Sequence, residues 1–304
     1  MHAAASPRFF HDAAFRLRRT SWLELAGVAF LGFFALILLR LAAPHALRPV
    51  LRSLGLVLPL ALLAAKDLAH LPDARRRLHA ATSWRARIGA LLPPELLGML
   101  RLDRLLWQGC LARMRRRAPA SAGVAPPDGI ALTYLRQGAY GTAVAVVMVS
   151  LFIELPIHVL VVNLLVKDPD ALFIVHLIGG IAAVYSFAWV LGDRWHVGAG
   201  RHVLADGVLH LRVGVRSQGD IPLAAVERME AITDTPERWR RRHGIHRADT
   251  LLVTPFDKPN CVLVIKPDAG ATLLHWQVRR PAPRHLLLYL DRPQLLAAQL
   301  ARVS

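Results

Sequence analysis

Two long apolar runs dominate residues 139–192, and they restrict this chain to few folds. A polar Lys-Asp-Pro-Asp break at residues 167–170 separates the runs. Each run is long enough for an α-helix to cross a hydrocarbon core of about 30 Å, which takes about 20 apolar residues. The pattern predicts a membrane-spanning helical hairpin in residues 137–193, with Pro169 ending the first helix.

Three ionisable residues interrupt these apolar runs. Glu154 and His158 are four residues apart, so they share one face of a helix. His158 and His176 each lie nine residues from Lys167, so antiparallel helices would bring the two histidines to a similar depth. Glu154 would then lie near the glycine pair at 179–180, where the absence of side chains allows close helix approach.

Glu154, His158 and His176 allow two interpretations. An ionisable residue within a membrane helix is a functional-site hypothesis by default. One carboxylate and two imidazoles suit a divalent metal ion or a proton relay. Alternatively, Glu154 and His158 only hydrogen-bond to each other and stabilise helix packing. The chain has no His-Glu-x-x-His motif, so a zinc-protease interpretation has no support.

A second hairpin is predicted in residues 21–66, after a basic tail at residues 1–20. The apolar run at 22–43 is too long for the core of a signal peptide, and no clear cleavage site follows it. The second run is weaker, because Arg52 precedes it and Pro59 interrupts it. Its length alone would also fit a re-entrant or interfacial segment.

The distribution of basic residues decides whether the second run spans the membrane or lies at its interface. Residues 66–136 hold Lys66 and twelve arginines, whereas the loops at 44–48 and 167–170 hold one basic residue each. Basic segments stay on the cytoplasmic side of a membrane. Four spans place the N-terminus, the basic segment and the C-terminus in the cytoplasm, whereas three spans would separate the two basic segments.

Residues 67–136 form a basic amphipathic connector. Its apolar residues Leu97, Leu100, Leu105, Trp107 and Leu111 recur at helical spacing among arginines. One or two such helices would lie on the cytoplasmic leaflet or, equally well, pack against the soluble domain. A linker at 121–129 leads into the third span.

The net charge of +17 comes mainly from arginine, since only four of the 38 basic residues are lysines. No zinc-finger spacing, RNP-like motif or helix-turn-helix pattern accompanies this charge, so nucleic acid is not an expected partner. Anionic lipid headgroups explain the charge at least as well. The two cysteines, Cys110 and Cys261, form no CxxC motif and fit a reducing compartment.

Residues 194–304 change to alternating apolar patterns with frequent turn signals. Residues 201–213 predict a β-hairpin around Asp206-Gly207. Further strands are expected near residues 221–223, 250–255, 260–266, 271–279 and 285–290. A final helix is expected from Pro293, with Asp291 as its N-terminal cap.

The stretches DGVLHLRVG, IPLAAVERME and KPNCVLVI resemble segments of the bacterial PH-like domains that are attached to membrane helices. The resemblance covers residues 195–302. It implies a small β-sandwich or barrel capped by a C-terminal helix, and it implies no activity. The basic segment 236–249 is an insertion relative to such a domain.

That insertion carries a second group of candidate residues. Arg238, Trp239, Arg240 and Arg241, together with Arg115, Arg116 and Arg117 of the connector, are candidates for contact with anionic lipid phosphates. Trp239 would insert at the headgroup level. The histidines at 243 and 246 are a weak metal signal and more typical of a solvated surface. No glycine-rich phosphate loop or G-x-S-x-G element is present.

These observations predict an α+β membrane protein with four transmembrane helices in two hairpins and a C-terminal PH-like β domain. We expect a non-enzymatic protein of the bacterial inner membrane, with no cofactor and both termini in the cytoplasm. Its PH-like domain would bind a protein partner or form a homo-oligomer. The alternative is a metal- or proton-handling membrane protein, active in transport or redox chemistry, that uses Glu154, His158 and His176.

The topology can be tested with reporter fusions. Fusions after Arg117 and after Ser304 should both report the cytoplasm, and a fusion at Asp168 the opposite side, because thirteen basic residues lie in segment 66–136. The four-span topology is wrong if the Arg117 and Ser304 reporters lie on opposite sides.

Overall fold

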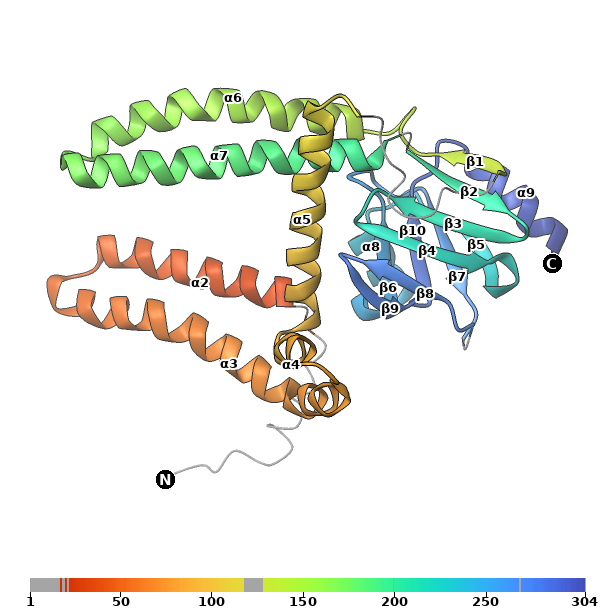
Figure 1. Cartoon of the computed structure of the whole chain (residues 1–304), viewed down its shortest axis with the longest axis horizontal. Coiled ribbons are helices and arrows are strands. Elements are labelled where there is room, and N and C mark those ends of the chain that lie inside the picture. The colour runs from red at the N-terminus through yellow and green to blue at the C-terminus, as the bar shows by residue number, and fades with distance from the viewer. Residues whose placement is uncertain are drawn as a thin grey trace. The chain divides into compact units, whose positions relative to one another are not determined.

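A computed structural model describes residues 17, 20, 22–117, 128–198, 200–267 and 269–303. The chain divides into two compact units, Met1–Gly98 and Met99–Ser304. The described part combines long apolar helices with two β-sheets in the C-terminal part, so the predicted α+β class is confirmed (Figure 1).

The first unit is helical. Helix α2 (Trp22–Ala42) and helix α3 (Arg48–Ala80) run side by side and are joined by a short 3₁₀ turn at His45–Leu47 (Figure 1). α3 does not end at Lys66, because it continues for 33 residues with Pro59 and Pro72 inside it. Lys66 is buried, and its amino group donates to the carbonyls of Leu17 and Thr20. Helix α4 (Trp84–Leu91) follows.

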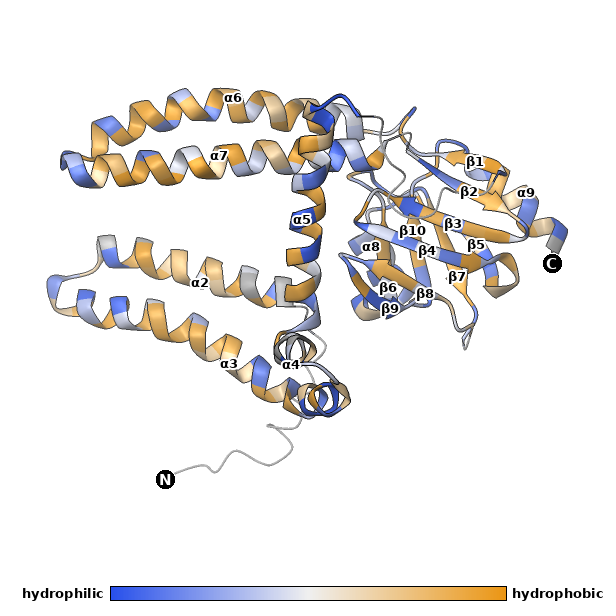
Figure 2. Cartoon of the chain, viewed as in Figure 1, coloured by the Kyte–Doolittle hydropathy of each residue, from blue (hydrophilic) through white to orange (hydrophobic). Residues whose placement is uncertain are grey.

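Three helices of the described chain are long and apolar enough to cross a membrane: His45–Ala80, Tyr140–Leu165 and Pro169–Val197. In Figure 2 most of the length of the last two of these helices (α6 and α7) and the middle of α3 are coloured as hydrophobic. Within α2 the stretch Gly27–Ile37 is a shorter apolar helix by the same measure. Three of the four predicted spans therefore have the length and composition of membrane helices.

The second unit contains the hairpin of helices α6 (Tyr140–Leu165) and α7 (Pro169–Val197). Its turn is shorter than the sequence predicts. The Asp168 carboxylate accepts from the backbone N–H of Ala171 at 2.9 Å, and Pro169 occupies the first turn of α7. Pro169 therefore starts the second helix instead of ending the first, because its fixed φ suits the first helical turn.

This unit also contains two sheets, and α5 (Pro94–Met114) precedes them in the chain. The first sheet has the order β1-β2-β3-β4-β8-β9, and the second, β5-β7-β10-β6, includes one parallel pair, β6 with β10. The strands are β1 (Ile130–Thr133), β2 (Arg201–Ala205), β3 (Val208–Val213), β4 (Ser217–Pro222), β5 (Val226–Ala231), β6 (Thr250–Val253), β7 (Cys261–Ile265), β8 (Thr272–His275), β9 (Val278–Pro281) and β10 (His285–Leu288).

One hydrophobic core joins the two sheets. Leu209 and Leu211 of β3 alternate with half-buried residues, as expected for a strand with one face on a core. Leu263 of β7 and Leu286 of β10 enter the same core from the second sheet. Helix α9 (Pro293–Val303) contributes Leu296. The predicted final helix is therefore part of the domain core.

Strand β1 is an element that the sequence does not reveal. It lies before α6, in the segment 67–136 predicted as a connector, and it pairs antiparallel with β2, which follows α7. The pairing runs from Ile130 opposite Leu204 to Thr133 opposite Arg201. The α6–α7 hairpin is therefore inserted between two adjacent strands of one sheet.

The segment 271–279 also differs from its prediction as a single strand. It forms the hairpin of β8 and β9, with Trp276 and Gln277 at φ values of 51° and 60° in its turn. The backbone N–H of Trp276 donates to the carbonyl of Arg216 at 2.7 Å, and the Gln277 amide donates to the carbonyl of Val215 at 2.6 Å. These two hydrogen bonds hold a turn geometry that non-glycine residues rarely adopt.

Because β1 belongs to the sheet, a domain that begins after α7 should be incomplete. We expect residues 128–134, joined by a loop of about four residues to residues 200–304, to be more stable than residues 200–304 alone by about 3 kcal/mol. Burial of Leu132 and Tyr134, each 1% exposed, supplies this difference. Urea unfolding of both chains measures it, and equal midpoints would show that β1 contributes nothing.

Candidate functional site

The two predicted intramembrane histidines do meet between α6 and α7. The ring centroids of His158 and His176 are 5.9 Å apart with an edge-to-face angle of 78°. The Nε2 atom of His158 is buried and has no hydrogen-bond partner among the described residues. The ring packs directly against Gly179, where a Cβ atom would overlap it. The absence of a side chain at Gly179 therefore accommodates His158.

Glu154 does not join the histidines. Its side chain is exposed, and within the described residues no hydrogen bond or ion pair connects it to His158 or His176. The residue opposite Gly179 is thus His158, whereas the sequence placed Glu154 there. No group of three or more His, Cys, Asp or Glu residues in the described ranges could hold a metal ion. Among the described residues, the two histidines meet without Glu154, and the expected coupling of Glu154 with His158 is not seen.

The basic insertion contains helix α8 (Pro236–His243), and here the lipid hypothesis needs a correction. Trp239 is only 4% exposed and packs with Val262 and Leu287 on the outer face of the second sheet. Its ring also contacts the rings of His243 and His285. Trp239 therefore cannot insert into a headgroup layer, because it fills a small hydrophobic core of the domain.

The arginines around Trp239 differ among themselves. Arg238 and Arg241 are exposed, whereas Arg240 is half-buried. Arg240 pairs with Glu237 at 3.2 Å and donates to the hydroxyl of Thr250 at 3.4 Å. Of these three arginines, only Arg238 and Arg241 are exposed to solvent.

Arg115, Arg116 and Arg117 follow α5 and are exposed. Arg116 has a φ of 54°, and the N–H of Arg117 donates to the carbonyl of Ala112, so the chain turns sharply at the end of the helix. The indole N–H of Trp195 in α7 donates to the carbonyl of Arg117 at 3.4 Å. This hydrogen bond places the three arginines beside the last turn of α7.

A buried ion pair lies where the hairpin meets the sheets. Asp193, near the end of α7, is 4% exposed, and Arg216, between β3 and β4, is 7% exposed. The Nη2 of Arg216 donates to Oδ2 of Asp193 at 3.0 Å, and its Nε lies 2.9 Å from Oδ1. The hydroxyl of Tyr140, the first residue of α6, donates to Oδ2 of Asp193 at 2.9 Å. One carboxylate thus ties both helices of the hairpin to the β domain.

Arg216 makes further contacts that complete this arrangement. Its Nη1 donates to the carbonyl of Pro255 at 3.0 Å, and its guanidinium carbon lies 5.0 Å from the ring centroid of Phe256. The Phe256 ring stacks on Tyr140 at 5.9 Å. A charge this deeply buried is tolerated when it is paired and hydrogen-bonded, as Arg216 is.

Two more carboxylates hold the segment between β1 and α6. Asp291 accepts from the backbone N–H groups of Arg136 and Gln137, both at 3.0 Å. Asp257 accepts from the N–H of Ala139 immediately before α6. Burial raises the pKa of Asp257 and exceeds the opposing effect of its hydrogen bond with Ala139. Asp291, which the sequence suggests as a helix cap, thus binds the entry to the hairpin.

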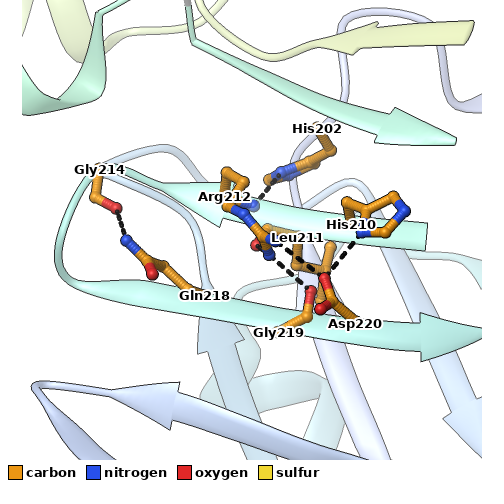
Figure 3. A network of polar contacts seen from close by, with 8 residues as sticks. All are labelled: His202, His210, Leu211, Arg212, Gly214, Gln218, Gly219 and Asp220. Carbon is orange, nitrogen blue, oxygen red and sulfur yellow. Dashed lines mark hydrogen bonds and ion pairs between the residues drawn. The ribbon is translucent and has the colours of Figure 1, made fainter. Parts of the chain in front are cut away.

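A cross-strand polar cluster lies on β3 and β4 (Figure 3). Asp220 accepts from His210 at 2.8 Å and from Arg212 at 2.9 Å. Arg212 also donates to the carbonyls of Leu211 and Gly219. Partial burial opposes ionisation of Asp220, but the hydrogen bonds and charges of His210 and Arg212 outweigh it and lower its pKa. The cluster fixes the β3–β4 register.

His202 of β2 supports the same hairpin from the other face (Figure 3). It is buried, and its Nδ1 accepts from the backbone N–H of Arg212 at 3.0 Å. Its ring lies 4.8 Å from that of Tyr134. Burial lowers the pKa of His202 to about 3, so the imidazole is neutral at physiological pH. His202 is thus a structural histidine in the core.

A cavity of about 180 Å³ lies between Arg113 at the end of α5 and the last turn of α7. Arg194, Trp195 and Gly198 form the rest of its lining, and Arg194 donates to the carbonyl of Gly198 at 3.2 Å. Two guanidinium groups favour an anion over a cation here. This cavity and the buried ion pair both lie at the C-terminal end of α7.

Sequence reasoning missed the residues of this junction. Tyr140 begins the first apolar run and Asp193 follows the second, so an antiparallel hairpin brings them to the same end. This matched position was the one signal in the sequence for their contact. Arg216 lies in a hairpin of ordinary composition, so its partner cannot be inferred from spacing. A comparison of the chain with protein-family models, curated proteins and solved structures finds no match.

The ion pair gives a direct test of the junction. Replacing Arg216 with Met should destabilise the protein by about 3–5 kcal/mol, because Asp193 would remain buried without its partner. Arg216→Met combined with Asp193→Asn should recover part of this loss, since the amide carries no charge and still accepts from Tyr140. Thermal unfolding of the purified protein measures both effects.

The matched control is Arg194→Met, which removes an exposed arginine one residue from Asp193. We expect it to cost below about 1 kcal/mol. If Arg216→Met costs no more than Arg194→Met, the buried pair does not hold the junction together.

Proposed function

We propose that this chain is a non-enzymatic protein of the bacterial inner membrane that holds a β domain at the cytoplasmic surface for partner binding or assembly. Four spans in two hairpins would carry the chain through the bilayer, with α2 as the first span. The length of α2, 21 residues, supports its inclusion. The excess of arginine in the connector supports cytoplasmic termini.

The PH-like identity of the β domain is part of this proposal. Two sheets around one core and a C-terminal helix support it. Helix α8 lies within the segment that the resemblance treats as an insertion. Its buried Trp239 gives that insertion a packed place on the second sheet.

The observation that carries the proposal is the insertion of the α6–α7 hairpin between β1 and β2. A domain attached by one flexible linker would move freely at the membrane. Here the chain enters the hairpin from β1 and leaves it into β2, and these two strands pair with each other. The Asp193–Arg216 pair is buried beside these connections. A partner that binds the β domain would therefore act on the hairpin directly.

Metal or proton handling remains the second candidate function. The observation in its favour is the ring contact of His158 and His176, with one buried ring nitrogen that lacks a partner in the described chain. Glu154 adds no ligand to this pair. Two imidazoles alone are fewer ligands than a structural or catalytic zinc site uses.

Site-specific photo-cross-linking in cells tests the leading function. A photoreactive amino acid at Leu252, 45% exposed on β6 at the end of the second sheet, should yield a discrete protein adduct. An exposed strand at a sheet edge is a common place for a partner to pair. The same probe at Ile153 on α6, 55% exposed, is the control and should label lipid.

The outcome decides between assembly and partner binding. An adduct of twice the chain mass indicates a homo-oligomer, and any other discrete mass indicates a partner. The absence of a discrete protein adduct at Leu252 and at a second exposed position of the β domain, Pro222, would contradict the proposal.

A further inference from the structure

Helix α5, which belongs to the second unit from Met99 onward, crosses the last turns of α7 (Figure 1). The backbones touch at two glycines. A Cβ atom at Gly192 would overlap the carbonyl of Leu106, and one at Gly109 would lie 2.9 Å from the carbonyl of Gly192. His196 of α7 donates from Nε2 to the carbonyl of Leu105 at 2.8 Å. α5 therefore packs closely on α7 at this crossing.

One face of α5 is turned towards the hairpin. Tyr185 of α7 donates to Asp103 at 2.6 Å, and its ring lies 6.2 Å from that of Trp107. Tyr185 lies eight residues before Asp193, which is about 12 Å along the helix towards the middle of the apolar run. The face of α5 that carries Asp103 and Trp107 thus faces the apolar part of α7.

The same face carries an exposed apolar stripe. Leu100, Leu111 and Met114 are 56%, 47% and 69% exposed, and their spacing from Trp107 puts them on its side of the helix. The opposite face is covered, because Leu102 and Leu106 are fully buried against Val215. We define Leu100, Trp107, Leu111 and Met114 as the α5 stripe. Trp107 contacts Tyr185, and the other three members are exposed in the part of the chain that the structure describes.

Exposed arginines accompany the α5 stripe. Arg101, Arg104 and Arg115 lie along one flank of it at helical spacing. Long basic side chains beside an apolar stripe reach the phosphate level while the stripe enters the acyl region. The charge pattern fits the anionic surface of a cytoplasmic leaflet.

We propose that α5 lies in the plane of the cytoplasmic leaflet, with the α5 stripe at the acyl boundary and its arginines on anionic lipid phosphates. This proposal rests on the membrane-spanning role of the α6–α7 hairpin. Lipid is the occupant because the same face contacts Tyr185 within the apolar run, and lipid borders the hairpin at that depth. The leaflet then covers the stripe and sets the height of the β domain above the membrane.

Fluorescence quenching on the full chain in nanodiscs tests this placement. Leu111→Cys labelled with NBD should be quenched by lipids that carry a doxyl group near the headgroup, and little by aqueous iodide. Glu227→Cys on β5 should show the reverse. The unsubstituted chain gives the background from Cys110 and Cys261, which are both buried.

A third position separates failure of this inference from failure of the proposed function. Val161→Cys on α6, 42% exposed, should be quenched by deep doxyl lipids if the hairpin spans the membrane. Iodide quenching at both 161 and 111 would refute the spanning hairpin. Iodide quenching at 111 alone, or protection of 111 from both quenchers by a second copy or by residues 22–80, would overturn the lipid-facing α5.

Lipid composition tests the arginines. Doxyl quenching at 111 should be about twofold stronger in nanodiscs with phosphatidylglycerol than in pure phosphatidylcholine. The double variant Arg101→Gln, Arg104→Gln should lose this difference, while Arg238→Gln, Arg241→Gln on α8 should retain it. Equal quenching in both lipids, or an unchanged difference in the α5 variant, would refute the contact with anionic phosphates.

Discussion

The pairing of β1 with β2 is the constraint on which the rest of the second unit depends. These strands flank the α6–α7 hairpin in the chain, so their antiparallel register fixes both ends of the hairpin at one edge of a sheet. One residue beyond the ladder, on the side of the helices, the N–H of Tyr134 donates to the carbonyl of Gly200 at 2.9 Å and extends the pairing of the two chain segments. A hairpin closed in this way moves with its domain.

Three carboxylates, two of them buried, reinforce that closure. Asp291 and Asp257 accept from the backbone before α6, and Asp193 joins Tyr140 to Arg216. Asp193 is buried with its partners Tyr140 and Arg216, which would otherwise lack a carboxylate acceptor in a low-dielectric region. Together with the glycine contacts of α5, these carboxylates make the junction a packed interface.

The predictions from sequence differ in quality for physical reasons. The long apolar helices follow from a local property, the length of apolar sequence, and the hairpin around Asp206-Gly207 follows from local turn chemistry. The turn at Trp276-Gln277 was not predicted, because neither residue favours a positive φ and only its hydrogen bonds to Val215 and Arg216 select it. Trp239 reads as a membrane anchor among arginines, yet the local pattern does not reveal the apolar face of β7 and β10 that covers it.

The sequence by itself determined the α+β class, three of the four predicted membrane-length helices and the matched depth of His158 and His176, because helix periodicity and antiparallel geometry are local rules. Only the tertiary structure decided that Glu154 stands apart from those histidines, that β1 belongs to the sheet and that Asp193 pairs with Arg216. Ile130 and Leu204 lie about 70 residues apart in the chain yet face each other in one ladder. Such contacts form because the whole domain packs around them, and no single segment encodes that packing.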